Sequence, residues 1–216
     1  MMNPFLNRIR SVEKSVSLNH KIINTAGILL LGSFLGALSK FLDTTPANKL
    51  PFLLEFLDVR NFLGRFAFWV LIALCISLYG NSPGRASVNV FVFFAGMVTS
   101  YYGYSKFIAG FFPRSYAMIW AGFTLISPIL AFFCWYAKGK GKWALALAAM
   151  LLAVLFNMSF SYGIHYFNVR SILELITFLC GVAVLRRHTV KDTVIMLGMG
   201  ICIAFVLDWV VPFHFG

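Results

Sequence analysis

Charged residues are scarce in this sequence, and acidic residues are the scarcest of them. Only 12% of the 216 residues are charged, and 7 Asp and Glu residues stand against 18 Lys and Arg residues. With 60% hydrophobic residues and a mean hydropathy of +0.84, the chain has too few polar residues to enclose its apolar side chains in a water-soluble core. The composition therefore excludes a soluble globular protein and predicts an integral membrane protein in contact with a lipid bilayer.

The surplus of basic residues would suggest a nucleic-acid partner if the chain were soluble. Here the formal net charge of +11 comes from Lys and Arg residues that lie mostly in short loops between apolar runs. In membrane proteins, an excess of Lys and Arg in such loops indicates which side of the membrane is cytoplasmic. We therefore expect no nucleic acid as a partner.

Cysteine is also scarce, and its spacing does not resemble that of a ligand set. The four cysteines each lie inside an apolar run: Cys75, Cys134, Cys180 and Cys202. No CxxC pair and no histidine at ligand spacing accompanies them. We interpret them as small, reduced core residues and expect no metal site, disulfide or cofactor.

Catalytic motifs are missing from the sequence. It contains no metal motif, phosphate-binding loop or nucleophile elbow. Ser39 and Lys40 are adjacent on a predicted helix, where neighbouring side chains diverge by about 100° and cannot form a dyad. His165 with Asp208 or Glu174 offers an acid–base pair, but a lone histidine at a membrane boundary is more often a polar helix end. The sequence thus favours a protein that is not an enzyme and identifies no catalytic residue.

Long apolar runs, by contrast, are abundant. Seven of them predict helices: Ile22–Leu42, Phe62–Tyr79, Ala86–Tyr104, Ser115–Ala137, Trp143–Tyr162, Ser171–Leu185 and Thr193–Val211. We predict an all-α, polytopic membrane helix bundle with about seven transmembrane helices, forming one domain over residues 22–216. The sixth run has about 15 residues and rises only about 23 Å against a hydrocarbon core of about 30 Å. The bundle has six spans if that run does not cross.

The segment that precedes the first apolar run is polar and basic. In residues 1–21, Phe5, Ile9, Val12 and Val16 repeat at helical spacing, which predicts a cytoplasmic amphipathic helix lying in the membrane interface. The apolar run that follows is longer than the core of a signal peptide, roughly 7–15 residues, so we expect it to be retained.

The longest loop covers residues 44–61. Pro46 and Pro51 interrupt it, and its leucines recur beside Glu55 and Asp58 at helical spacing. We predict a short surface helix there that lies over the mouth of the bundle.

Small residues mark one face of the first helix. Gly32 and Gly36 form a GxxxG pair, and Ser39, Lys40 and Asp43 continue the same stripe. Because such a pair lets another backbone approach closely in lipid, we expect Gly32 and Gly36 to pack against a neighbouring helix.

The distribution of basic residues predicts the orientation. Eleven Lys and Arg residues lie on the N-terminal side of a seven-span topology: Arg8, Arg10, Lys14, Lys21, Arg85, Lys138, Lys140, Lys142, Arg186, Arg187 and Lys191. The other 7 of the 18 lie on the opposite side. The positive-inside rule therefore places the N-terminus in the cytoplasm and the C-terminus outside.

This topology gathers unusual polar residues in one outward-facing layer. The candidate ligand-binding residues are Lys40, Asp43, Arg65, His165, Arg170, Glu174 and Asp208. Together with Lys106 and Arg114, the cations of this layer outnumber its carboxylates by two, which favours a small anionic solute as a ligand. Ionised groups at membrane depth need partners, so Glu174 and Asp208 should face the bundle interior.

Structural interpretations of the same residues remain open. Cations at helix ends commonly extend to lipid headgroups without binding a solute. In the same structural interpretation, an aromatic belt at the membrane interface is formed by Tyr101, Tyr102, Tyr104, Tyr116, Trp120 and Trp209. An internal ion pair that joins helices is an equally good reading of Asp208.

Around the end of the first helix the sequence resembles a known group of proteins. The run Gly36-Ala37-Leu38-Ser39-Lys40-Phe41-Leu42-Asp43 is similar to the Ser-Lys-x-x-Asp ending in a family of small bacterial multi-pass proteins of unknown function. Further likeness lies in Ser82-Pro83, Tyr101-Tyr102, Trp120, Ser127-Pro128 and Trp135-Tyr136-Ala137-Lys138-Gly139. The resemblance covers about the first two thirds of the chain and implies a bacterial inner (cytoplasmic) membrane.

A looser resemblance is to the substrate-binding subunits of energy-coupling-factor vitamin transporters. These are small basic helical bundles whose ligand pocket opens outward beneath the loop after the first helix, and they assemble with other membrane subunits. The resemblance implies a transport-related protein that binds a small solute. Two alternatives remain: a structural or regulatory membrane subunit without a ligand, and an intramembrane enzyme acting on a lipid-like substrate.

Overall fold

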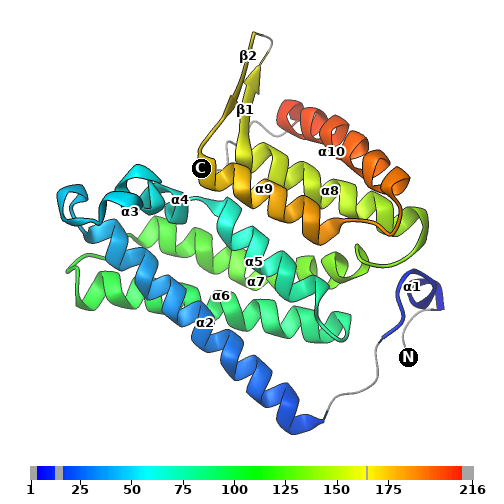
Figure 1. Cartoon of the computed structure of the whole chain (residues 1–216). Coiled ribbons are helices and arrows are strands. Elements are labelled where there is room, and N and C mark those ends of the chain that lie inside the picture. The colour runs from blue at the N-terminus through cyan, green and yellow to red at the C-terminus, as the bar shows by residue number, and fades with distance from the viewer. Residues whose placement is uncertain (1–3, 13–16, 164, 211–216) are drawn as a thin grey trace.

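Helices run back and forth between the two ends of this protein, and a short hairpin projects from them (Figure 1). The computed structural model describes residues 4–12, 17–163 and 165–210. The helical elements are α1 (Pro4–Ile9), α2 (Leu18–Thr44), η1 (Ala47–Lys49), α3 (Phe52–Phe56), α4 (Val59–Gly64), α5 (Phe66–Leu78), α6 (Pro83–Phe107), α7 (Arg114–Tyr136), α8 (Gly141–Ser159), α9 (Ile172–Leu185) and α10 (Val190–Val210). The strands are β1 (Phe160–Gly163) and β2 (Tyr166–Val169).

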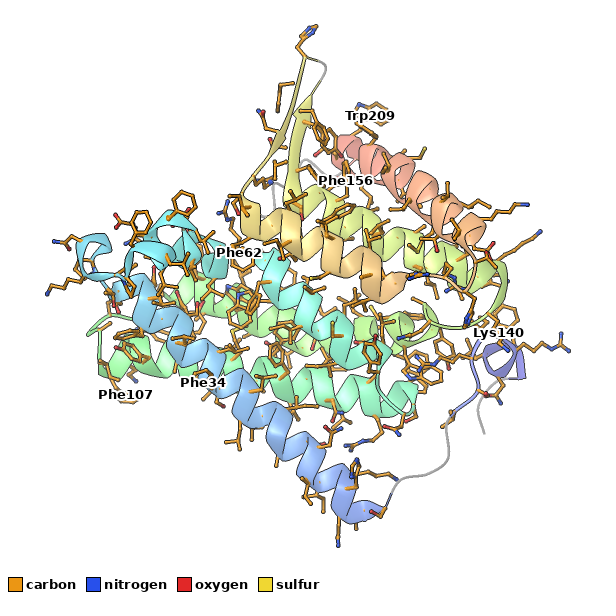
Figure 2. All side chains as sticks on the ribbon, in the orientation of Figure 1. Phe34, Phe62, Phe107, Lys140, Phe156 and Trp209 are labelled. Atoms are coloured by element: carbon orange, nitrogen blue, oxygen red, sulfur yellow. The ribbon has the colours of Figure 1, made fainter. Side chains whose placement is uncertain are left out.

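Within the described residues, 4 helices are long and apolar enough to cross a membrane: α2, α7, α8 and α10. Large apolar side chains such as Phe34 and Trp209 project from the outer surface (Figure 2), with 64% and 87% of their area exposed. Such side chains are stable outside the core when lipid covers them. The chain is thus a multi-pass helical membrane protein.

The number of spans stays a prediction. With 25 residues α6 is long, but it carries Arg85, Asn89 and Lys106 along its length. The 13 residues of α5 and the 14 of α9 make shorter apolar helices. Each of these two rises only about 20 Å, less than the roughly 30 Å of the hydrocarbon core.

The short helix α5 lies at the centre of the fold. It packs against α6 and α7 on one side and against α8 and α9 on the other (Figure 1). Helix α2 completes the first group by packing along α6, and α10 completes the second by packing along α8. The sequence of α5 is apolar all round, as expected of a helix surrounded by other helices.

The contact between α2 and α6 runs along small residues. A side chain at Gly32 would meet the carbonyl of Phe93, and one at Gly36 would meet the carbonyl of Met97 and the hydroxyl of Ser100. From the other helix, Gly96 lies against α2 in the same way. The two backbones therefore touch where glycine leaves room.

Pro128 lies inside α7. Proline has no N–H to donate to the Thr124 carbonyl, but the Ser127 hydroxyl donates to that oxygen at 2.8 Å. The Ser87 hydroxyl of α6 donates to the Pro128 carbonyl at 2.7 Å. The Ser127 hydroxyl thus satisfies the carbonyl that proline leaves without a backbone donor, and the Ser87 hydroxyl joins α6 to α7 beside it.

The all-α prediction is wrong at residues 160–169, where an antiparallel hairpin replaces the end of the predicted helix Trp143–Tyr162. Helix α8 ends at Ser159, where Phe160 takes extended backbone angles, φ −119° and ψ 147°. The ring of Phe160 lies 5.2 Å from the ring of Phe167 across the hairpin and 5.2 Å from that of Phe178 in α9, measured between centroids. Tertiary packing therefore overrides the apolar helical pattern here.

The predicted helix Phe62–Tyr79 is also wrong at its start, because Arg65 divides it. Arg65 has extended backbone angles, φ −96° and ψ 164°, between α4 and α5. The indole N–H of Trp69 donates to the Leu63 carbonyl at 2.8 Å, which satisfies an acceptor that a continuous helix would use. The loop predicted to hold one surface helix holds η1, α3 and the start of α4 instead.

The N-terminal segment packs on the bundle through the turn between α7 and α8. The amide of Lys140 donates to the Ile9 carbonyl at 2.7 Å, and Ile9 is buried. The predicted amphipathic helix is limited to α1 within the described residues, with Val16 outside them. Helix α2 begins at Leu18, where the hydroxyl of Ser17 accepts from the amide of His20.

Candidate functional site

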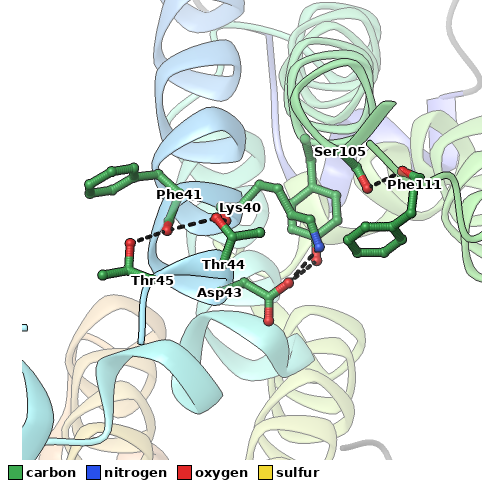
Figure 3. Close-up of polar contacts among 8 residues, drawn as sticks. Lys40, Phe41, Asp43, Thr44, Thr45, Ser105 and Phe111 are labelled. Carbon is green, nitrogen blue, oxygen red and sulfur yellow. Dashed lines mark hydrogen bonds and ion pairs between the residues drawn. The ribbon is translucent and has the colours of Figure 1, made fainter. Parts of the chain in front are cut away.

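The last turns of α2 hold a buried lysine. Lys40 is only 2% exposed, and its Nζ lies 2.6 Å from Oδ2 of Asp43, one helical turn along (Figure 3). The carboxylate side chain of Asp43 is 47% exposed. The pair therefore joins a cation inside the protein to a carboxylate at its surface.

Local hydrogen bonds end the helix just beyond this pair. The hydroxyl of Thr44 donates to the Lys40 carbonyl at 3.0 Å, and that of Thr45 donates to the Phe41 carbonyl at 2.7 Å (Figure 3). These bonds satisfy carbonyls that lack partners in the last turn. Two threonines after Asp43 thus terminate α2 and hold the ion pair at its end.

Aromatic rings surround the ammonium group of Lys40. Its Nζ lies 5.0 Å from the ring centroid of Tyr101 in α6 and 4.5 Å from that of Phe111. The Tyr101 hydroxyl also donates to Oδ2 of Asp43, at 3.4 Å. Phe111 follows α6, and its carbonyl accepts from the Ser105 hydroxyl at 2.8 Å (Figure 3). Cation–π contacts and one carboxylate together offset the cost of burying the charge.

A small pocket lies beside this group, among α2, α4, α5, α6 and α7. It is lined by Ser39, Leu63, Gly64, Trp69, Met97, Tyr101, Tyr102 and Trp120. Its volume is about 40 Å³. A water molecule takes about 30 Å³ in the liquid, and small-molecule sites usually measure about 300–1,000 Å³. In this conformation the pocket has room for one or two water molecules.

A second ion pair joins the α4–α5 break to α9. Nε of Arg65 lies 2.9 Å from Oε1 of Glu174, and the Glu174 side chain is completely buried. A guanidinium nitrogen of Arg65 also lies 3.9 Å from the more exposed carboxylate of Asp58. The Glu174 amide donates to the hydroxyl of Ser171, the N-cap of α9, at 3.3 Å. The backbone break at Arg65 thus directs its side chain toward Glu174.

The remaining predicted residues lie around the hairpin. His165 is exposed in the turn between β1 and β2, and Arg170 follows β2, where its amide donates to the Ser159 carbonyl at 3.1 Å. Asp208 is half-buried on α10 and acts electrostatically on Tyr162 of β1. Burial, with a smaller contribution from Asp208, raises the pKa of Tyr162 to about 12.

The predicted polar layer is therefore divided. The structure brings Lys40 to Asp43 and Arg65 to Glu174, whereas Asp208 acts on Tyr162 of the hairpin and His165 lies exposed in the hairpin turn. In the part of the chain that the structure describes, no three His, Cys, Asp or Glu side chains gather as a metal site would require.

Sequence reasoning missed the aromatic residues of the site. Tyr101 and Trp120 fit an interfacial belt in the structural interpretation of the sequence; in the fold Tyr101 contacts the Lys40–Asp43 pair and both residues line the small pocket. Tyr116 and Trp209, which are 67% and 87% exposed, do lie at the surface. Aromatic residues occur both in packed sites and at lipid interfaces, so the sequence alone does not show in which of the two places a given aromatic residue lies.

Comparisons extend neither the site nor the fold. No protein-family model, curated protein or solved structure matches this chain.

Proposed function

We propose that this multi-pass membrane protein binds a small anionic solute at the Lys40–Asp43 end of the bundle, as a transport-related binding subunit. One observation carries the proposal: a lysine ammonium that is buried inside the bundle has a counterion, Asp43, whose side chain is 47% exposed. A carboxylate or phosphate of a solute can take the place of Asp43 beside the ammonium. Charge-assisted contacts of this kind are strong in a site shielded from water.

Tyr101 connects this exchange to the pocket. It contacts both members of the ion pair and lines the 40 Å³ pocket beside Ser39. Displacement of Asp43 by a solute frees the Tyr101 hydroxyl, and a change in its rotamer enlarges the pocket. Binding of a solute at this site therefore requires a larger pocket than the 40 Å³ seen here.

A thermal-shift screen of the purified protein tests the proposal. The screen uses anionic vitamins, nucleobases and amino acids on the wild type, on Lys40→Met and on Lys106→Met, a matched control at an exposed lysine near the same end. We expect at least one anionic compound to raise the melting temperature of the wild type and of Lys106→Met, and to leave Lys40→Met unchanged. Equal shifts in all three proteins would reject the site.

A second candidate function is that of a structural or regulatory subunit without a ligand. The observation that favours it is the Arg65–Glu174 pair, because a completely buried carboxylate with an arginine 2.9 Å away joins the α4–α5 break to α9. This candidate predicts that no anionic compound in the same screen stabilises the wild type.

A further inference from the structure

The opposite end of the bundle gathers basic residues from two turns. The turns between α7 and α8 and between α9 and α10, together with the first residues of α8 and α10, contain six cations: Lys138, Lys140, Lys142, Arg186, Arg187 and Lys191. The guanidinium of Arg187 donates to the carbonyls of Ala137 and Gly139, at 2.7 and 2.8 Å. These bonds hold the two turns together, so the cations form one cluster.

A cavity opens within this cluster. It has a volume of about 210 Å³ and is lined by Gly141, Lys142, Leu145, Arg187 and Asp192. At about 30 Å³ per water molecule, this volume accepts an anion of the size of phosphate with part of its hydration shell. Two cations and one carboxylate leave the lining with a surplus of positive charge.

The first turn of α8 adds to that positive charge. Its N-cap is Lys140, which makes no capping hydrogen bond through its side chain, and the first turn of the helix has no acidic residue. A helix N-terminus carries a partial positive charge and unpaired N–H groups, so lysines placed there are repelled unless an anion is bound. Gly141 has a positive φ of 84°. A glycine there adopts this conformation without strain and leaves the backbone open on the cavity side.

The surroundings of the cavity point to a lipid. Burial lowers the pKa of Arg187, although Asp192 acts in the opposite direction, so this guanidinium lies in a partly desolvated place. Trp143, one residue from Lys142, is 64% exposed, and tryptophan at such a position anchors helices at the level of lipid headgroups. Clusters of four to eight basic residues beside membrane helices are typical binding sites for anionic lipids.

We propose that this cavity binds the phosphate group of an anionic phospholipid headgroup, with Lys142 and Arg187 as its cationic contacts. The α8 N-terminus donates N–H groups to the same phosphate. Asp192 lowers the affinity because its carboxylate shares the cavity with the ligand. The site lies at the end of the bundle opposite Lys40 and does not depend on the solute site there.

Two substitutions test the site: one is expected to weaken the affinity for the lipid, and the other to strengthen it. In detergent micelles we measure the melting temperature against increasing dioleoylphosphatidylglycerol, with dioleoylphosphatidylcholine and inorganic phosphate as separate arms. Lys142→Gln should weaken the apparent affinity for phosphatidylglycerol roughly fivefold, as expected for the loss of one direct contact between a cation and an anionic headgroup. Asp192→Asn should strengthen it, a result that a poorly folded variant cannot produce.

Lys191→Gln is the matched control, because Lys191 is exposed in the same cluster but does not line the cavity. It should retain the wild-type affinity. If inorganic phosphate also stabilises the wild type, the phosphate group alone is recognised; if only phosphatidylglycerol does, the lipid is the ligand. Equal losses in Lys142→Gln and Lys191→Gln, or stabilisation by phosphatidylcholine equal to that by phosphatidylglycerol, would overturn the proposal.

Discussion

Gly36 and Lys40 lie one turn apart on α2, and each depends on what α6 places opposite it. The backbone of Met97 faces Gly36, and the ring of Tyr101 faces Lys40. Small residues bring the helices close, and that closeness is what buries the lysine beneath an aromatic ring. The close helix packing and the polar site therefore share the same two helix faces. Met97 and Tyr101 are one turn apart on α6 and face Gly36 and Lys40, which are one turn apart on α2.

Gly36→Leu should therefore destabilise the protein. A side chain there collides with the Met97 carbonyl and the Ser100 hydroxyl, and overpacking a tight contact typically costs about 1–3 kcal/mol. Thermal unfolding in detergent should show a lower melting temperature. Gly27→Leu is the control on the same helix, because nothing lies within 4 Å of a side chain at that position. Equal melting temperatures for the two variants would show that the α2–α6 contact is not as described.

The N-terminal segment forms hydrogen bonds with helices that are far from it in sequence. The guanidinium of Arg10 donates to the carbonyls of Leu78 and Trp135, at 2.9 and 2.8 Å, and lies 4.0 Å from the ring centroid of Trp135. Leu78 ends α5, and Trp135 lies in the last turn of α7. A cation at two helix C-termini satisfies their carbonyls and interacts favourably with both helix dipoles.

We expect Arg10→Gln to lower the melting temperature, because hydrogen bonds to a charged group contribute about 1.5–3 kcal/mol. Arg8→Gln removes the same charge from an exposed position of the same segment and should have little effect. Circular dichroism during heating measures both. If the two variants melt together, Arg10 contributes only through its charge and the contacts to α5 and α7 are unimportant for stability.

For the whole molecule, the tertiary contacts gather the basic segments at one end. Arg10 reaches the ends of α5 and α7, and Arg187 reaches the turn between α7 and α8. Arg85, at the start of α6, donates to the Lys21 carbonyl of α2 at 2.8 Å. Arg10, Arg85 and Arg187, which the positive-inside rule assigns to one side of the membrane, thus each bind the end of a helix or a turn between helices.

This charge asymmetry predicts a cytoplasmic N-terminal end. A reporter active only in the cytoplasm should be active when fused before Met1 and inactive when fused after Gly216. A second reporter, active only outside the cytoplasm, should give the reverse result. Activity of the cytoplasmic reporter at both ends would mean an even number of spans and would remove one short helix, α5 or α9, from the count.

Composition and periodicity alone predict that this protein lies in a bilayer, and they locate most of its helices. Composition and long apolar runs are summed over many residues, so they predict a bilayer and helix positions to within a few residues without knowledge of any contact. The stripe of Gly32, Gly36 and Lys40 was visible for the same reason, because it depends only on helical periodicity.

Contacts between distant residues, by contrast, follow from how the helices pack together. Arg65 and Glu174 are more than a hundred positions apart, and their contact required a helix break that the apolar run Phe62–Tyr79 does not signal. The hairpin at residues 160–169 depends on aromatic contacts with α9 and α10, which outweigh the local helical pattern. Tyr101 became part of the site because α6 turns it toward Lys40 rather than toward lipid. Pairings of this kind arise from the relative positions of helices, which local periodicity does not contain.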